Sequence, residues 1–589
     1  MRIVVETEIR EDSDLRRAWN DLALRMEHPE VFYTYEWALA VQRAYGDRLK
    51  PLVFLAYEGD ALVAVVAFAS EKTGSSLGFL TSSTGDYCDF LSEPGRRQEF
   101  VDAVFAELKN RTTAKIVLTN LPADSSTVAA LRCAASSRRY HLRSRTAYVC
   151  ARVVPGAGEE RVSLKHTVGG KKRLRRNMRE LEKRGGVSVR HDTQWDQIEP
   201  VLQSFHRAHI ARFLATGRIS NQVRKERRAF LYELAHELSH SGWVTVSRLF
   251  VGETAAAWNY GFRFAGSWFW YQPTVNSGYE DFSPGYCLLA KIVQLACDSP
   301  DIDLIDLGLG AEDYKERFAT AGRQTLYVVL NNSFAGHLRE IVRENAAAIA
   351  KASPKVENGI RSVISYAGKM RARLGESGVL GLMRWVGRRT LNSLFAYEKV
   401  LFFDSPRSDE SQMGNSGLTL RQLDSDILGA AAISYEHDPV TLNYLMRSAN
   451  RFRSEESVGF ALVTSEETPV HFCWAKNFEG FEMAELGRKL QAPCANAVMI
   501  FDCFTPVSAR GHGFFAEAIA ALAHRLRSEG KAPWIFGAAT NQASLRGIEK
   551  SGFTYKFSLG RRKVLGFVKE KDSIGEHGLT NVPGAVPAP

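Results

Sequence analysis

One order of predicted elements occurs three times along this chain of 589 residues. In each copy two apolar runs flank an acidic or glycine-containing turn, which predicts a β-hairpin. The predicted hairpins are Leu52–Phe68, Val244–Phe262 and Gly459–Ala475. Each is followed by an amphipathic helix and then by a short apolar strand. The repetition favours three related α/β units, and unrelated α+β domains that share common elements are the alternative.

The helices predicted after the hairpins begin near Phe100, Tyr286 and Phe514, and the final strands begin near Lys115, Ile302 and Pro533. The expected fold class is α/β (α+β), with three units that are each a mixed, mostly antiparallel sheet flanked by helices. The expected boundaries are a first unit at 1–150, a second at 151–330, a basic helical linker at 331–414, a third unit at 415–570 and a disordered tail at 571–589.

The three copies differ at the point where the helix begins. A helix N-terminus offers unpaired N–H groups and a partial positive charge, and glycines let an anion approach the backbone. The third copy has Arg510-Gly511-His512-Gly513 before Phe514, whereas the second has only Ser283-Pro284-Gly285. The first copy, Glu93-Pro94-Gly95, starts with an acidic residue. The third copy is therefore the best predicted anion site.

At these residues the third unit, over about 418–567, resembles the GNAT acyltransferase superfamily, whose members bind acyl-CoA. Arg510 and Gly513 match the family's pyrophosphate loop, and Phe515 replaces its final small residue. The resemblance implies acetyl-CoA or another acyl-CoA as co-substrate. The implied cofactor-binding residues are Arg510, Gly511, His512, Gly513, Phe514, Phe515, Asn541 and Ser544. The tyrosine that many members use as general acid would fall at Ile548.

Residues 1–330 resemble the Fem-like double-GNAT group, and more closely the CelD-type acetyltransferases of exopolysaccharide biosynthesis. The first two units would then be two GNAT-like halves of one Fem-like module. The resemblance depends on Asp86-Tyr87-Cys88-Asp89 and on the segment Asp306–Phe318. The latter matches the group's D-x-x-x-G-x-x-x-Y-K pattern at Asp306, Gly310, Tyr314 and Lys315.

Several side chains are candidates for the chemistry of acyl transfer. Asp502, the only carboxylate on its predicted strand, is the candidate base, although it could be a solvent-facing edge residue. Tyr314 is a candidate acid and Lys315 a candidate ligand for an acceptor phosphate or carboxylate, unless Tyr314 packs and Lys315 is a surface charge. The candidate acceptor-binding carboxylates are Asp86, Asp89 and Asp306. The first two could instead cap a turn.

No metal site is expected. His236-Glu237-Leu238-Ser239-His240 has the spacing of a zinc-protease helix. The apolar stripe of that helix, which includes Leu234 and Leu238, lies on the side opposite both histidines. No third ligand is evident at a suitable spacing, and the eight cysteines contain no C-x-x-C pair.

The net charge of +10 is concentrated in two segments. Lys171–Arg184 has eight basic and two acidic residues, and Lys351–Arg389 has nine and two. This distribution disfavours a nucleic acid bound over the whole protein. The second segment is amphipathic and could contact an anionic membrane or act as a packed helical linker. With no signal peptide or apolar run of membrane-spanning length, we expect a cytoplasmic protein, either free or peripheral at the inner face of the membrane.

The function expected is acetyl-CoA-dependent acylation of an amine or hydroxyl. The acceptor would be a small molecule, such as a sugar or lipid-linked glycan precursor in surface polysaccharide biosynthesis. One alternative is aminoacyl transfer from aminoacyl-tRNA, as in Fem proteins, which predicts steeply salt-dependent tRNA binding. The other is a degenerate, non-catalytic GNAT scaffold or sensor at the membrane face, favoured by the isoleucine at position 548.

Overall fold

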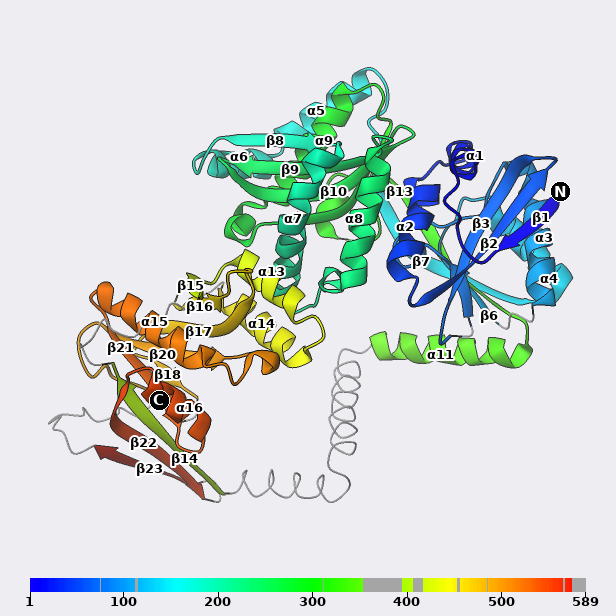
Figure 1. Ribbon diagram of the computed structural model, residues 1–589. Coiled ribbons are helices and arrows are strands. Elements are labelled where there is room, and N and C mark those ends of the chain that lie inside the picture. The colour runs from blue at the N-terminus through cyan, green and yellow to red at the C-terminus, as the bar shows by residue number, and fades with distance from the viewer. Residues whose placement is uncertain are drawn as a thin grey trace. The chain divides into compact units, whose positions relative to one another are not determined.

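The computed structural model describes residues 1–74, 76–111, 115–310, 312–352, 395–405, 417–452, 456–484, 486–564 and 567–574 (Figure 1). It divides into two compact units. The first, here the N-terminal module, contains Met1–Arg212 and Asn221–Ala347, and the second, here the C-terminal unit, contains Ala348–Pro589 with Phe213–Ser220. Most of the predicted basic connector (353–394) and most of the predicted tail (575–589) lie outside the described residues.

The N-terminal module is built on one sheet, to which 13 described strands belong. The first half contributes β1 (Arg2–Glu6), α1 (Ser13–Leu24), α2 (Tyr35–Tyr45), β2 (Leu49–Glu58), β3 (Ala61–Glu71), β4 (Ser76–Phe79), β5 (Leu91–Ser92), α3 (Arg97–Asn110), β6 (Lys115–Pro122), α4 (Thr127–Arg138) and β7 (His141–Val153). The second half contributes α5 (Glu159–Gly170), α6 (Lys172–Glu182), β8 (Val187–Asp192), α7 (Trp195–Ala215), α8 (Lys225–Ser239), β9 (Val244–Val251), β10 (Thr254–Phe264), β11 (Ser267–Val275), α9 (Pro284–Asp298), β12 (Leu304–Asp306), α10 (Asp313–Glu316), β13 (Ala321–Asn331) and α11 (Phe334–Ala352).

The two halves exchange their last strands. β13 from the second half pairs with β6 of the first half, with Val328 opposite Leu118. β7 from the first half pairs with β12, with Val153 opposite Ile305, and along its whole length with β13. β7 therefore crosses the predicted boundary at residue 150, and the halves share one sheet.

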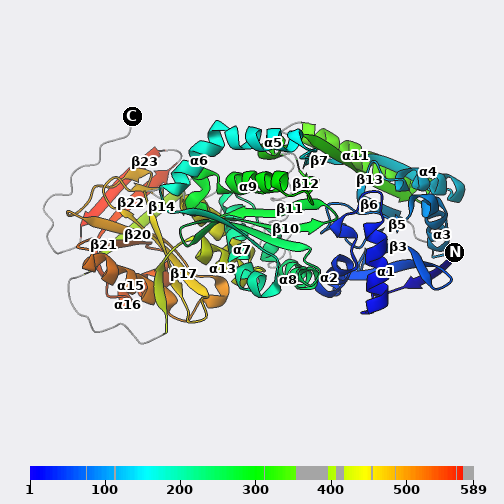
Figure 2. The ribbon, with the colours of Figure 1, turned by 90° about the horizontal axis from the view of Figure 1, so that it is seen from above.

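Helices cover both faces of this sheet. In the second half, α7 and α8 lie on one side of β10 and β11, and α5 and α9 lie on the other (Figure 2). The alternation of β10 explains this arrangement, because Trp258 and Tyr260 belong to the core beneath α7 and α8, whereas Ala257 belongs to the core beneath α9. Strand residues are thus buried on both faces, as β9 shows with seven of eight residues buried.

The C-terminal unit has its own sheet, with strand order β15-β16-β17-β20-β21-β14-β22-β23. Its elements are β14 (Phe395–Asp404), β15 (Thr419–Gln422), α13 (Ser425–Ser434), α14 (Pro439–Phe452), β16 (Val458–Val463), β17 (Pro469–Asn477), β18 (Glu482–Met483), β19 (Arg488–Lys489), β20 (Ala497–Phe504), α15 (Phe514–Ser528), β21 (Ala532–Ala538), α16 (Gln542–Lys550), β22 (Thr554–Val564) and β23 (Phe567–Ile574). β14 falls within the segment predicted to be a linker, yet it lies between β21 and β22.

The structure confirms the predicted fold class of mixed sheets flanked by helices. The three predicted hairpins are β2–β3, β9–β10 and β16–β17, and each is antiparallel. The predicted helices are α3, α9 and α15, and the predicted final strands are β6, β12 and β21. In the described ranges, no helix is both long enough and apolar enough to cross a membrane.

Candidate functional site

Three strand pairs in the described ranges run parallel, and one occurs in each predicted repeat. They are β4–β6, β11–β12 and β20–β21. In each case at least one strand continues beyond the last paired residues. Residues of this unpaired continuation line a cavity. We call these the N-terminal, central and C-terminal cavities, with volumes of about 650, 490 and 720 Å³.

The C-terminal cavity contains several of the predicted site residues. Pairing of β20 with β21 ends at Ile500 and Ile535. Beyond that point both strands line the cavity, together with α15, α16 and the end of α14. The predicted residues among its lining are Asp502, Phe515, Asn541 and Ser544. Asp502 and Asn541, which are 39 positions apart in the sequence, thus line the same cavity.

Asp502 lies at an irregularity in β20. The register with β17 shifts between the Phe472–Phe504 pair and the Trp474–Phe501 pair, and Asp502 adopts a left-handed φ of 46°. Such a conformation is unusual for a residue with a side chain. The carboxylate forms a 2.5 Å ion pair with Arg451 from α14 and is about one-third exposed. β20 is an interior strand, so Asp502 is not a sheet-edge residue.

The predicted anion loop forms the turn before α15. Gly511 and Gly513 have φ values of 86° and 84°, and a Cβ atom on either would meet no atom within 4 Å. Gly513 is the N-cap residue and no side chain caps the helix, so the first N–H groups of α15 remain available to a ligand. Arg510 donates to the Thr505 carbonyl at 3.2 Å. His512 contacts the Arg510 carbonyl, and its ring stacks on Phe514.

Asn541 and Ser544 begin α16. The Ser544 N–H donates to Asn541 Oδ1 at 3.2 Å, which caps the helix. Ile548, one turn further along, is buried and also lines the cavity. No tyrosine is among the described residues that line the C-terminal cavity. The phenol expected from the family pattern is therefore absent from that lining.

The central cavity contains Tyr314. Trp270 of β11 donates through Nε1 to the Tyr314 hydroxyl at 3.1 Å, and burial raises the pKa of Tyr314. Its phenol is therefore a neutral donor at physiological pH. The start of α9, Ser283-Pro284-Gly285, lines the same cavity together with Arg173 of α6. Ser283-Pro284-Gly285 is the helix start of the second repeat, which the sequence analysis compared with that of the third.

Lys315 does not line the central cavity. It is 5% exposed, and its Nζ donates to the Leu309 carbonyl at 2.8 Å and pairs with Glu312 at 2.8 Å. Its position therefore restrains the turn after β12. Its proposed contact with an acceptor phosphate or carboxylate stays a prediction.

The signature segments of the two halves meet in the structure. The Tyr87 hydroxyl donates to Asp306 Oδ2 at 2.7 Å, although 219 residues separate them, and Arg152 donates to the same oxygen at 2.8 Å. Burial, with a further contribution from the Asp306 carboxylate, raises the pKa of Asp86 to about 7. Asp89 lies apart from this junction: it accepts from Thr127 at 2.5 Å and lies 3.5 Å from the buried Arg97. Acceptor binding by these three carboxylates stays a prediction.

In the first repeat, a buried arginine lies where the helix begins. Arg97, at the beginning of α3, is 1% exposed and donates to Ser92 and Thr127 side chains at 2.7 and 2.6 Å.

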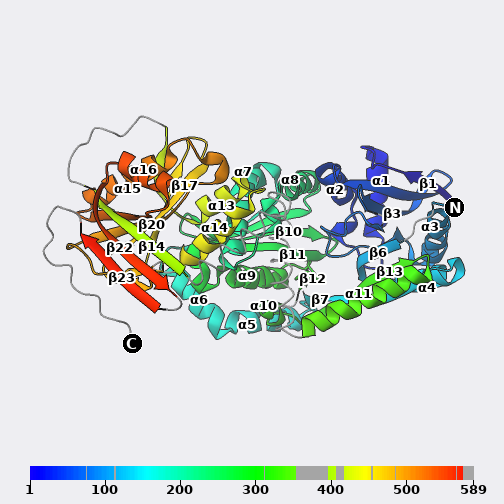
Figure 3. The same cartoon turned by 90° about the horizontal axis from the view of Figure 1, so that it is seen from below.

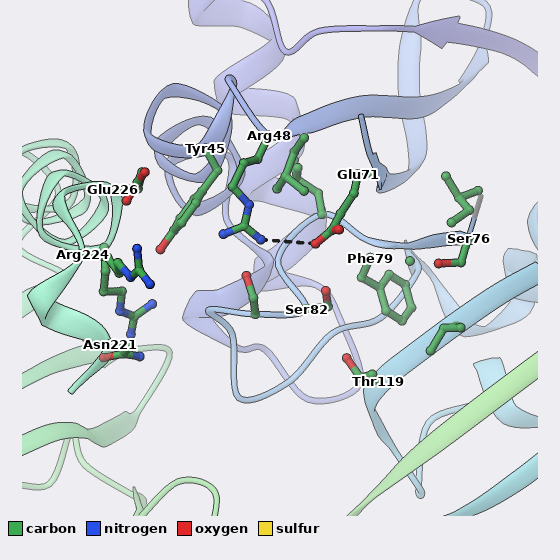
Figure 4. Close-up of a pocket in the computed structure, with 18 residues that line it drawn as sticks. Tyr45, Arg48, Glu71, Ser76, Phe79, Ser82, Thr119, Asn221, Arg224 and Glu226 are labelled. Carbon is green, nitrogen blue, oxygen red and sulfur yellow. Dashed lines mark hydrogen bonds and ion pairs between the residues drawn. The ribbon is translucent and has the colours of Figure 1, made fainter. Parts of the chain in front are cut away.

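The N-terminal cavity lies between the two halves of the module. Arg48 and Ser82 come from the first half, and Asn221 and Arg224 come from the second (Figure 4). Arg48 is paired with Glu71 at 3.2 Å. The lining also includes Arg227, which the sequence analysis did not identify.

Arg227 is 5% exposed. One terminal nitrogen donates to the Tyr271 hydroxyl at 2.8 Å. Nε and the other terminal nitrogen have no partner at regular hydrogen-bond geometry, and Tyr45 is the other polar side chain that interacts with the guanidinium. Within the described residues no carboxylate pairs with it. Its spacing from Phe230, Leu231 and Leu234 places it on the buried stripe of α8. This spacing is the feature of the sequence from which its burial could have been predicted.

The side chains of the His236–His240 motif contact other side chains of the protein. Glu237 pairs with Arg16 and Arg43, each at 2.8 Å. The two histidine rings contact each other at 5.0 Å. In the described part of the chain, no group of three or more His, Cys, Asp or Glu residues could hold a metal ion.

Residues 169–316 match the protein family described as "Acetyltransferase (GNAT) domain". The chain carries a GNAT domain. The matched residues include α6, the strands β8–β12 and the lining of the central cavity except Arg317. The GNAT domain thus corresponds to the second of the three predicted repeats, and Tyr314 lies within it.

Three solved structures that the chain resembles have low sequence identity. FemX is 8% identical over 56% of this chain and 97% of that one, with a TM-score of 0.41. The C-terminal domain of a putative lysylphosphatidylglycerol synthetase from Agrobacterium fabrum is 11% identical over 56% and 95%, with a TM-score of 0.38. A tandem GNAT protein of clavulanic acid biosynthesis is 12% identical over 56% and 98%, with a TM-score of 0.32. No curated protein sequence matches the chain.

Proposed function

We propose that the protein transfers an acyl group from acyl-CoA, with acetyl-CoA as the donor, to an amine or hydroxyl. The uncapped start of α15, flanked by Gly511 and Gly513 and followed by the C-terminal cavity, carries this proposal. The pyrophosphate would accept from the first N–H groups of α15, which also carry the positive end of the helix dipole. The pantetheine would extend between the diverging ends of β20 and β21, past Asn541 and Ser544.

In the proposed reaction the acceptor attacks the thioester carbonyl carbon. The new bond to carbon forms, the C–S bond breaks, and the acceptor's proton passes to a base while CoA leaves as a thiolate. Asp502 is the proposed base. The irregularity in β20 takes the N–H groups of Asp502 and Cys503 out of the regular ladder with β17, so they can polarise the thioester carbonyl.

We propose that the N-terminal cavity is a separate anion site, distinct from the place where the acceptor meets the thioester. A buried guanidinium without a carboxylate partner is unfavourable unless an anion compensates it. Arg227 is such a group, and Arg48 and Arg224 add positive charge at the same opening. These side chains suit a phosphate- or carboxylate-bearing ligand, and the acceptor that we propose for the reaction remains a sugar or lipid-linked precursor of a surface polysaccharide.

A second candidate is aminoacyl transfer from aminoacyl-tRNA. The cationic helix α6 favours it, because its Arg173 lines the central cavity of the GNAT domain. A tRNA would contact many basic side chains, so its affinity would fall steeply with salt. A filter-binding titration with tRNA at two salt concentrations checks this. Acetyl-CoA binding without tRNA binding would exclude it.

Calorimetric titration with acetyl-CoA tests the leading proposal. We expect Gly513→Glu to abolish binding at the C-terminal cavity, because a carboxylate would occupy the place of the pyrophosphate. Gly530→Glu is the matched control: Gly530 has φ of 75°, is equally open, and follows the other end of α15. It should bind as the wild type does. No acetyl-CoA binding by the wild type, or equal binding by both variants, would contradict the proposal.

A further inference from the structure

Helix α11 exposes a stripe of large apolar side chains. Phe334, Leu338 and Val342 are 66%, 50% and 61% exposed. Their spacing of four residues places them on one side of the helix. Exposed apolar side chains that occur singly are ordinary on a protein surface, but a contiguous row of them indicates a surface that contacts something apolar.

Packing of the opposite face fixes the direction of this stripe. Glu340 is 4% exposed and accepts from Lys115 of β6 at 2.7 Å. The His337 ring stacks on His141 at the start of β7, with 5.5 Å between centroids. α11 therefore lies against the end of the sheet at β6 and β7 (Figure 3). Phe334 contacts the edge of the His141 ring but stays largely exposed, and Leu338 and Val342 face away from the core.

The charged residues beside the stripe are positive. Arg339 and Arg343 are exposed, and Arg343 is paired with Glu340 at 2.7 Å. Glu340 is the only acidic residue between positions 334 and 343, and it is buried. The outward face of α11 thus combines apolar and cationic side chains and presents no carboxylate over these ten positions.

We propose that this face of α11 binds an anionic lipid surface. An interfacial helix inserts its apolar stripe at the level of the headgroups, and a flanking arginine, here Arg339, pairs with a lipid phosphate. Contact with a second copy fits less well, because a two-fold interface would bring the same arginines close to each other. This inference is independent of the proposed reaction, and it would place the N-terminal module at a membrane where lipid-linked acceptors are found.

Co-sedimentation of the full chain with vesicles tests it, using phosphatidylcholine alone or mixed with phosphatidylglycerol. We expect the wild type to bind the mixed vesicles and Leu338→Glu to lower the partition coefficient by at least about tenfold, because the apolar contact is lost. Arg339→Gln should lower it by about fivefold. Val162→Glu on α5 is the matched control, since Val162 is 56% exposed, and it should bind as the wild type does.

Three results would overturn the inference. They are binding to phosphatidylcholine alone that equals binding to the mixed vesicles, full binding by Leu338→Glu, and a loss in Val162→Glu equal to that in Leu338→Glu. Sedimentation velocity without vesicles gives a separate check. A dimer that Leu338→Glu dissociates would assign the stripe to self-association instead. Because position 338 is exposed, the thermal unfolding of the variant should match the wild type.

Discussion

Phe515 occupies the space that a side chain at position 547 would need. A Cβ atom on Gly547 would lie 2.4 Å from Phe515 Cδ1, although real Cβ contacts are longer than 3.0 Å. Gly547 lies inside α16, where glycine is otherwise unfavourable. Phe515 stands where the family pattern has a small residue, and Gly547 accommodates the larger ring. The two positions thus form a compensating pair, of which Phe515 lines the C-terminal cavity.

The contact between Phe515 and Gly547 predicts that the effect of Gly547→Ala on stability changes sign when the Phe515 ring is removed. Gly547→Ala should destabilise the C-terminal unit by about 1–3 kcal/mol, because the methyl group overpacks against Phe515. In a Phe515→Ala background the same change should stabilise it by about 0.5–1 kcal/mol, the usual helix preference for alanine. Denaturant unfolding of the four proteins measures this cycle. Destabilisation of equal size in both backgrounds would show that the ring is not the cause.

Asp502 should be needed for turnover but not for binding of the donor. Asn has nearly the same volume and tolerates the left-handed φ of 46°, so Asp502→Asn should fold normally. We expect kcat to fall by about 100-fold or more, as for loss of a general base, with little change in the acetyl-CoA affinity. Steady-state kinetics with calorimetry on the same preparation checks this. A variant with wild-type kcat would remove Asp502 from the proposed chemistry.

Asp86 predicts a pH-dependent contribution to stability. Its pKa in the folded protein is about 7, whereas an Asp in an unfolded chain titrates near ~3.9. Between these values the unfolded state binds fewer protons, so ionisation favours unfolding and wild-type stability falls as the pH rises from about 4 to about 7. Asp86→Asn should lack this component. Unfolding free energies at several pH values would show the difference between the two proteins growing with pH, and a constant difference would contradict the assignment.

Arg227 should be unfavourable for stability but favourable for ligand binding. Arg227→Met keeps most of the side-chain length and removes a buried cation that has no carboxylate partner, so the unfolding temperature should stay equal or rise. The same change, made in the Gly513→Glu background so that the start of α15 does not bind the probe, should abolish stabilisation by added pyrophosphate, used here as a probe of the N-terminal cavity. Arg17→Met, which changes an exposed arginine of α1, is the control. Equal pyrophosphate effects in the Gly513→Glu background with and without Arg227→Met would exclude the cavity as an anion site.

Local patterns were sufficient to predict the repeated elements. Alternating apolar residues identified β2–β3, β9–β10 and β16–β17, and apolar periodicity identified the helices that follow them. Short motifs also predicted several residues of the C-terminal cavity, because turn glycines and helix caps depend on neighbours in the sequence. Asp502, Asn541 and Ser544 are brought together in this way.

Features that depend on pairing between distant segments were not predictable in the same way. The apolar pattern of β7 does not specify whether it pairs with β6 or with β13, and β14 has nothing in its sequence that assigns it a position between β21 and β22. Arg227 was missed for a different reason: a charged residue at a helix start normally faces solvent, and only its spacing from Phe230 and Leu231 places it inside.

The exchange of β7 and β13 has a consequence for synthesis on the ribosome. When the first 153 residues have been made, β7 has neither of its strand partners, because β12 and β13 have not yet been translated. β6 likewise presents an unpaired edge until β13 arrives. The nascent first half therefore carries an open sheet edge during translation of almost 180 further residues, which makes this stage the one most exposed to aggregation and the natural point for chaperone binding.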